Sequence, residues 1–313
     1  MIKHYTILPI LGLVFGAGLS NMAIGDTLPL NTALSQARIA CSGISADMSD
    51  LKKMAGINTA VTGVGTVAGG VALGTGIAKA DIDSDIETYE KLLQELRDKS
   101  DRKTAEMIDE NAADEALANM PQTEKDFEKL IADYTQKSKT LGTIRTGTLA
   151  GAAVTDTVGT IIASQNRVDE DLQQRIDNCI RATDNLKNAR SAAIAENTAT
   201  QQELDKADKI TKACADWKNV DLTSIDKRAK GATISGGTGA ALAVAGTITS
   251  ASANSDKVRD GDNDKEKSLN TASNVLAGGT TVASAVATIF NATQISAIKK
   301  AVNAADKCEE ALR

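Results

Sequence analysis

Few side chains of this sequence could take part in catalysis or bind a metal ion. The 313 residues include one histidine, His4, which lies in a segment with the features of a signal peptide. We predict that residues 1–25 are this signal peptide, because a basic start and a mainly apolar run precede small residues before Asp26. An uncleaved anchor is the alternative. Removal of the segment would leave no histidine, which excludes histidine-dependent triads and histidine-ligated zinc.

Four cysteines are the next candidates for chemistry, and their positions favour disulfides. No two of them form a CxxC pair, and cysteines of exported chains are commonly oxidised. The best pairing joins Cys41 to Cys179 and Cys214 to Cys308, so that one bridge closes each half of the chain. Cys179–Cys214 with Cys41–Cys308 competes with it, because four cysteines permit three pairings and the sequence does not choose between them.

Two further patterns have some features of ligand sites. Residues 63–70, GVGTVAGG, have glycine spacings similar to those of a dinucleotide loop, but no strand precedes them. The charged turn at residues 256–267 lacks the ligand spacing of an EF-hand. We therefore expect no enzyme activity, no cofactor, no metal ion and no small-molecule substrate. The net charge of −6 also argues against nucleic acid as a partner.

The elements that carry these residues are predicted to be helices. The chain has only three prolines and is rich in Ala, Lys, Glu and Gln, so we expect an all-α protein. Four long stretches consist mainly of Gly, Ala, Thr, Ser and aliphatic residues. They are residues 56–78, 141–164, 231–255 and 268–298, and the only charged residues among them are Arg145 and Asp156 in the second stretch.

The stretches and cysteines together predict two long antiparallel helical hairpins that arose by internal duplication. Each cysteine lies 38 to 41 residues from the far end of its arm, at Ala80, Leu141, Ser255 or Ser268, so the four arms have matched lengths. The first hairpin would comprise residues 26–80 and 141–196, and the second residues 197–313.

Residues 81–140 are predicted to extend the first hairpin as an acidic coiled-coil arm. This segment holds seventeen acidic and nine basic residues. Apolar residues recur at spacings of three and four on both sides, which is the pattern of an antiparallel helical pair. These residues are Ile82, Ile86, Tyr89, Leu93, Leu96, Phe127, Ile131, Tyr134 and Leu141. The arm would meet a protein partner or serve as a solvated spacer.

Small residues spaced four apart are predicted to form the packing faces of the stretches. Residues four apart share a helix face, and small side chains allow two helix backbones to approach closely. The predicted packing residues are Thr62, Thr66, Gly70, Gly74, Gly147, Gly151, Gly159, Gly237, Ala241 and Ala245.

The stretches are compatible with a membrane-spanning bundle or with a soluble one. Each reaches the roughly 20 residues of a membrane span, and Arg145 and Asp156 are eleven apart, which would place both in a bundle interior. In a soluble or peripheral bundle they would be edge residues. The small number of strongly apolar residues favours the soluble bundle. A hairpin that is soluble first and inserts later is a third alternative.

The predicted function is non-catalytic. We expect an exported helical protein of a bacterial periplasm, cell surface or envelope membrane, with a structural, adhesive or self-assembly role through a protein partner or through self-association. The alternative is a membrane-inserting pore or permeability factor built from the glycine-rich hairpins. The sequence does not identify which residues would bind a partner.

Overall fold

The computed structural model describes residues 28–106, 110–255, 258 and 263–313. Every regular element within these residues is a helix, as the sequence predicts, and four of the helices are long and packed antiparallel. The predicted signal peptide, residues 1–25, lies outside the described residues. So does half of the charged turn at residues 256–267, between the last two long helices.

The chain divides into two compact units. We call the first the disulfide unit, because it contains all four cysteines. Its described residues are 28–46, Glu170–Val220 and Ala301–Arg313. The second, the bundle unit, comprises Asp47–Asp169 and Asp221–Lys300.

The disulfide unit is built from short helices. They are α1 (Leu30–Cys41), α4 (Glu170–Glu196), α5 (Gln201–Cys214) and η1 (Ala215–Asn219), and the end of α8 completes the unit. Helix α1 packs on α4 through buried alanines such as Ala33 and Ala37. Asn197 has a positive φ of 52° at the break after α4, and Thr200 then caps α5 in a capping box with Glu203.

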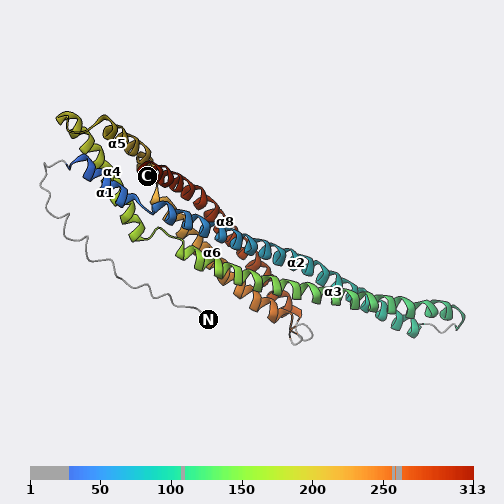
Figure 1. The fold of residues 1–313 in the computed structure, drawn as a ribbon. Helices are drawn as coiled ribbons and strands as arrows, with labels where there is room; N and C mark the ends of the chain where they lie inside the picture. Colours follow the sequence, from blue (N-terminus) through green and yellow to red (C-terminus); the bar gives the residue numbers. More distant parts are fainter. Residues whose placement is uncertain (1–27, 107–109, 256–257, 259–262) are drawn as a thin grey trace, which may run out of the picture. The chain divides into compact units, whose positions relative to one another are not determined.

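Four long helices form the bundle unit (Figure 1). They are α2 (Ile44–Glu106), α3 (Glu110–Gln165), α6 (Leu222–Ala253) and α8 (Asn263–Leu312). The four helices alternate in direction. Within the bundle unit, the starts of α2 and α6 therefore lie at the same end as the last residues of α3 and α8.

Buried residues in these helices recur at alternating spacings of four and three. Helix α6 buries positions 225, 229, 232, 236, 239, 243, 246, 250 and 253. Helix α3 buries positions 138, 142, 145, 149, 152, 156, 159 and 163, with Ala153 beside the row, and Asn166 continues it just beyond the helix. This average of 3.5 residues is the heptad repeat of left-handed coiled-coil packing. The seam consists mainly of Gly, Ala, Ser, Thr and Asn, so the helix backbones lie close together.

The hairpin arms are not continuous helices down to the cysteines, as full-length arms would require. The first is interrupted at Ser42 and Gly43, where Gly43 has a φ of 78° that favours glycine. The return arm ends at Gln165, and Cys179 lies on the separate helix α4. Only α8 runs unbroken through its cysteine, Cys308.

Helices α2 and α3 remain paired beyond the four-helix part of the bundle unit. Tyr89 lies 6.3 Å from Phe127 and 5.6 Å from Tyr134, measured between ring centroids. Leu93 is buried, and Ser138 donates a hydrogen bond of 2.5 Å to Asp83. The predicted apolar seam residues that lie among these contacts therefore face the partner helix.

Candidate functional site

An apolar band surrounds the four-helix part of the bundle unit. Sixteen of the nineteen exposed large hydrophobic side chains of the described residues lie within the four charge-poor stretches. We call these sixteen the aliphatic band: Ile57, Val64, Val67, Val71, Ile77, Ile144, Val154, Val158, Ile161, Ile234, Val244, Ile248, Val275, Val282, Val286 and Ile289. Exposed apolar surface of this extent marks a contact with lipid or with another protein.

The polarity of this part of the bundle is inverted relative to a water-soluble helical bundle. Arg145 and Asp156, the two charged residues of the four stretches, are both fully buried. The outward surface of the aliphatic band therefore carries no charge. The prediction that a soluble bundle would place these two residues at an edge is wrong, because both occupy seam positions of α3.

The length of the aliphatic band matches the interior of a lipid bilayer. On α2 the band extends from Ile57 to Ile77, which corresponds to about 30 Å of helix at about 1.5 Å per residue. The apolar core of a bilayer is also about 30 Å thick. The band is aligned between helices, since Gly76 packs beside Asn274 at one end and Gly159 packs beside Thr62 near the other.

Arg145 forms the centre of a buried polar layer at one end of the band. Its guanidinium donates to three neutral oxygens: Ser250 Oγ at 3.0 Å, Asn274 Oδ1 at 3.0 Å and Asn270 Oδ1 at 2.6 Å. The three acceptors come from α6 and α8, so the network joins three helices. These hydrogen bonds satisfy the guanidinium without a carboxylate in direct contact.

A second buried cation, Lys79, lies in the next layer toward the α2–α3 extension. Its ammonium group contacts Asp83 at 2.6 Å and Glu266 at 2.8 Å. Asn270 also donates to Glu266 at 3.4 Å, which links this layer to that of Arg145. The two cations and two carboxylates balance, so these adjacent layers carry no net charge.

Asp156 lies in a different layer, between glycines of two facing helices. Its Oδ2 accepts a hydrogen bond of 2.6 Å from Ser284, and its Oδ1 has no hydrogen-bond partner. A Cβ added at Gly239 would lie 2.7 Å from Oδ2, and one added at Gly65 would clash with Oδ1. The carboxyl group therefore fits only because both neighbours lack side chains.

Amides and hydroxyls fill the layers between Asp156 and the end of α3. Asn58 donates to Asn291 at 2.8 Å, and Thr288 donates to Thr62 at 3.1 Å. Gln294 donates to the backbone carbonyl of Asn166 at 3.0 Å. On the other side of Asp156, Leu149 packs with Ala72 and Ala277 in a small apolar layer.

The closest glycine contacts fall on a different row from the one predicted. Gly70, Gly74, Gly147 and Gly151 are exposed, and an added Cβ would meet no atom within 4 Å. Gly159 does pack closely, with Thr62 Cγ2 2.7 Å from its added Cβ, whereas the nearest atom at Gly237 is 3.8 Å away. Thr66 contacts Thr288 at 3.4 Å between hydroxyls.

Of the remaining predicted packing positions, Ala241 is exposed and Ala245 is half-buried. The glycines that do meet facing helices at seam positions are Gly65, Gly69, Gly76, Gly142, Gly236, Gly239 and Gly246. Their 3.5-residue spacing is the signal that would have identified them, because four-residue steps advance 400° and leave the seam by 40° each.

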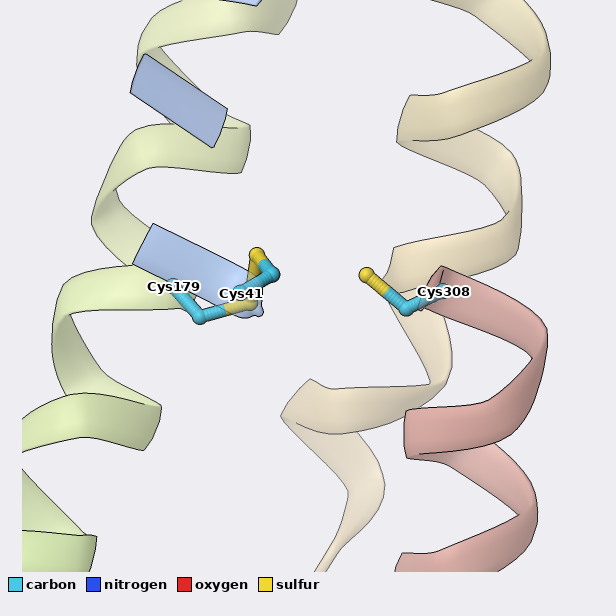
Figure 2. A group of neighbouring side chains, drawn as sticks. All are labelled: Cys41, Cys179 and Cys308. Carbon is cyan, nitrogen blue, oxygen red and sulfur yellow. A yellow bond between two sulfur atoms is a disulfide. The ribbon is translucent and has the colours of Figure 1, made fainter. Parts of the chain in front are cut away.

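The disulfide unit holds its cysteines in one cluster. Cys41 pairs with Cys179 and Cys214 with Cys308, which is the first of the two pairings considered. The sulfur atoms of Cys41, Cys179 and Cys308 lie within 4.8 Å of one another (Figure 2). All are bonded in disulfides, whereas thiolates are the metal-binding form. The disulfides indicate an oxidising compartment.

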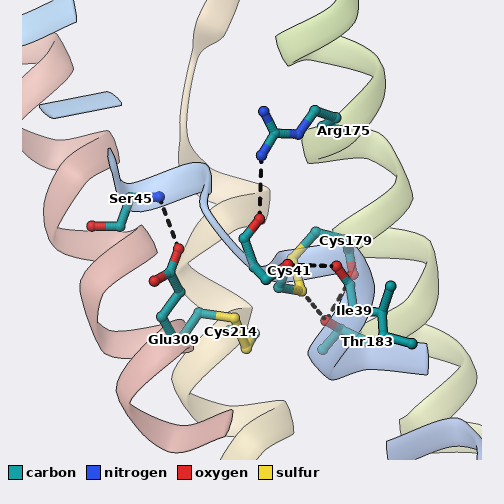
Figure 3. Close-up of a disulfide and its surroundings, with 10 residues drawn as sticks. Ile39, Cys41, Ser45, Arg175, Cys179, Thr183, Cys214 and Glu309 are labelled. Carbon is teal, nitrogen blue, oxygen red and sulfur yellow. Dashed lines mark hydrogen bonds between the residues drawn. A yellow bond between two sulfur atoms is a disulfide. The ribbon is translucent and has the colours of Figure 1, made fainter. Parts of the chain in front are cut away.

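Polar contacts fix the helices around this cluster (Figure 3). The Thr183 hydroxyl lies 3.9 Å from Cys41 Sγ and donates to the Cys179 carbonyl at 2.8 Å. Arg175 donates to the carbonyl of Ser42 at 3.2 Å, across the break between α1 and α2. These contacts lie within the disulfide unit, around the end of α1.

An exposed ion pair joins α2 to α8 outside the aliphatic band. Lys267 contacts Glu87 at 2.8 Å, and Lys91 contacts the same carboxylate at 2.9 Å. The hydrogen bond from Lys267, followed by that from Lys91, lowers the pKa of Glu87 to about 2. Glu87 is therefore ionised throughout the neutral range.

Among the described residues, two helices are long and apolar enough to cross a membrane by length and composition alone, within Leu30–Asp98 and Asp264–Leu312. Only 28% of the most apolar window of each is buried, unlike the core helix of a soluble protein. Helices α3 and α6 contribute four and three residues to the same band. Comparison of the chain with family models, curated proteins and solved structures gives no match.

Proposed function

We propose that this chain is a non-catalytic integral membrane protein of a bacterial cell envelope whose four-helix bundle spans the bilayer. One observation carries the proposal: the bundle exposes sixteen large aliphatic side chains and buries both charged residues of the same stretches. Water would favour the reverse arrangement, since apolar surface is buried and charge is solvated in soluble proteins. Lipid favours the observed one, because charged residues of membrane bundles face the interior.

The free energy of transfer from water to a membrane favours insertion when only the outward-facing side chains of the bundle are counted. Aliphatic residues contribute about −0.3 to −0.6 kcal/mol each at the centre of a membrane helix. The aliphatic band would therefore contribute roughly −5 to −10 kcal/mol. The cost of about 2.5–3.5 kcal/mol for each lipid-facing charge does not arise, because neither charged side chain faces lipid.

Four crossings give a defined topology. An even number of spans places every cysteine-bearing segment on one side of the membrane, which would be the oxidising side reached through the signal peptide. The α2–α3 extension, the coiled-coil arm of the sequence prediction, would lie on the opposite side. Two hairpins, α2–α3 without its extension and α6–α8, are the arrangement that an internal duplication would produce.

The arm supplies the functional surface of the proposal. Residues 81–140 have a net charge of −8, which favours a protein partner with a basic surface. The bundle would anchor this arm. Leu149, fully buried with Ala72 and Ala277, fills the bundle interior and argues against an open aqueous pore through a single copy.

Alkaline carbonate extraction followed by flotation tests the proposal. The full chain is expressed in a bacterium, and its membranes are washed with carbonate, which removes peripheral proteins. We expect the chain to remain with the membranes and to float with lipid in a density gradient. Aggregated protein would sediment instead, and its detection would require a repeat at lower expression. A chain recovered as a soluble, monodisperse helical protein without detergent would overturn the proposal.

A further inference from the structure

Asp156 is a buried carboxyl group without a countercharge. It is fully buried, and Oδ1 is one of only three buried side-chain polar atoms without a hydrogen-bond partner in the described part of the chain. The other two are Asn58 Oδ1 and Gln294 Oε1. All three are oxygen atoms, which accept hydrogen bonds, so the bundle interior offers acceptors in excess of donors.

The neighbouring helices supply no charged group to Asp156. The residues recorded beside its carboxyl group are Gly65 on α2, Thr155 on α3, Gly239 on α6 and Ser284 on α8, and none of them titrates near neutral pH. Arg145 lies eleven residues away on the same helix, about 16 Å along its axis. Its donors are directed at neutral oxygens of another layer.

An ionised carboxylate in this position would be expensive. A buried charge without a partner costs several kcal/mol and is usually neutralised instead. The Thr155 hydroxyl lies on the same side as Oδ1, with its Oγ1 3.0 Å from an added Cβ at Gly65, and it makes no hydrogen bond with Asp156 Oδ1. The Thr155 hydroxyl donates to the carbonyls of Gly151 and Ala152, so its own lone pairs remain able to accept.

We propose that Asp156 is a proton-binding site in the interior of the bundle. The bound proton resides on Oδ1, while Oδ2 accepts from Ser284. The unpartnered oxygens of Gln294 and Asn58 lie in the polar layers between Asp156 and the end of α3. The layer around Leu149 closes the opposite side. The inference concerns the interior alone and holds whether lipid or water covers the outer face.

Carbodiimide labelling of the full chain tests the site. Dicyclohexylcarbodiimide is an apolar reagent that adds to protonated carboxyl groups and leaves a stable mass increase on the labelled peptide. We expect labelling of Asp156 at pH 6.5, and at least tenfold less labelling of Glu87, which is exposed but ionised because its pKa is about 2. Asp156→Asn should abolish the first label and leave the second unchanged. Labelling of Glu87 at the level of Asp156 would contradict the proposal.

Thermal unfolding as a function of pH provides a second measurement that does not depend on reagent access. An unfolded aspartate has a pKa of about 3.9, so a protonated Asp156 must release its proton on unfolding. The folding equilibrium constant of the wild type should then fall as the pH rises from 5 to 7, by up to about tenfold per pH unit, relative to that of Asp156→Asn. A ratio of the two constants that stays the same between these pH values would overturn the proposal.

Asp226 is the matched control carboxylate for this measurement. It is also on a bundle helix, but Arg167 contacts it at 2.8 Å and Lys230 contacts it at 2.8 Å. These contacts, led by the Arg167 hydrogen bond, lower its pKa. Asp226→Asn should therefore change stability by the same factor at pH 5 and pH 7. The comparison separates a proton-binding carboxyl group from an ordinary ion-paired one.

Discussion

A lysine placed on the aliphatic band provides the sharpest test of the inverted polarity. Val67 is 67% exposed and lies at the middle of the band on α2, and Val282 is 65% exposed on α8. On a soluble surface, Val67→Lys and Val282→Lys should each change stability by no more than about 0.5 kcal/mol. In a membrane each would cost about 3 to 4 kcal/mol, because an aliphatic contribution is lost and a charge is added at mid-bilayer.

The double substitution should therefore remove most of the insertion free energy. Its cost of about 6 to 8 kcal/mol is comparable with the roughly −5 to −10 kcal/mol that the whole band contributes. We expect the membrane-embedded fraction after carbonate extraction and flotation to fall at least tenfold. The snorkelling of lysine to the interface is least effective at the middle of the band, which is why these positions were chosen.

Ile39 and Ile194 provide the matched control. They are 60% and 50% exposed on α1 and α4 of the disulfide unit, outside the aliphatic band. Ile39→Lys with Ile194→Lys adds the same two charges to exposed aliphatic positions and should leave the membrane fraction unchanged. Equal behaviour of the two double variants, with helical content and both disulfides intact, would refute the reasoning.

Three other predictions follow from the packing, the ion pairs and the disulfides. Gly65→Leu should lower the free energy of unfolding by about 1 to 3 kcal/mol or more through overpacking, whereas Gly70→Leu, at an exposed position, should not. Denaturant unfolding of both variants compares them. Equal losses of stability would contradict the assignment of Gly65 to the seam. The lowered pKa of Glu87 makes its contact with Lys267 stabilising above about pH 4.5, and this stabilisation is progressively lost as the pH falls toward 2. The stability difference between wild type and Glu87→Gln should therefore shrink over that pH range and with added salt. A difference that stays constant would exclude the contact. Cys41→Ser opens a loop of 138 residues and should cost about 4 to 5 kcal/mol in thermal unfolding, while a loss below about 1 kcal/mol would show that the bridge does not constrain the unfolded chain.

The helical class and the apolar contacts of the arm could be predicted from local sequence. Tyr89, Phe127 and Tyr134 recur at helical spacing, and the structure brings their rings together. These features depend on residues near one another in the chain or on a simple hairpin. The breaks at Gly43 and after Gln165 were missed, because the neighbouring sequence continues to favour helix and the interruption belongs to the packing of the disulfide unit.

The glycine contacts show where a local rule fails. A row of residues four apart begins correctly at Thr62, which is buried, but it turns by 40° at each step and has left the seam by Gly70. The contacts follow alternate steps of three and four through Gly65 and Gly69, because supercoiled helices keep only a 3.5-residue repeat in register. The sequence contains both rows, and only the facing helices select one.

The sequence by itself determined that four long helical stretches exist and that Arg145 and Asp156 are their only charged residues. It could not determine which side of each helix faces the others. In water the aliphatic face would turn inward, and in lipid the small and polar face would do so, since the favourable direction depends on the medium. The tertiary structure decided this by placing Gly, Ser and Asn in the seam, with Val67 and its equivalents outward. The reason is geometric: only residues without bulk allow four backbones to approach closely enough for Arg145 to reach its partners on two other helices.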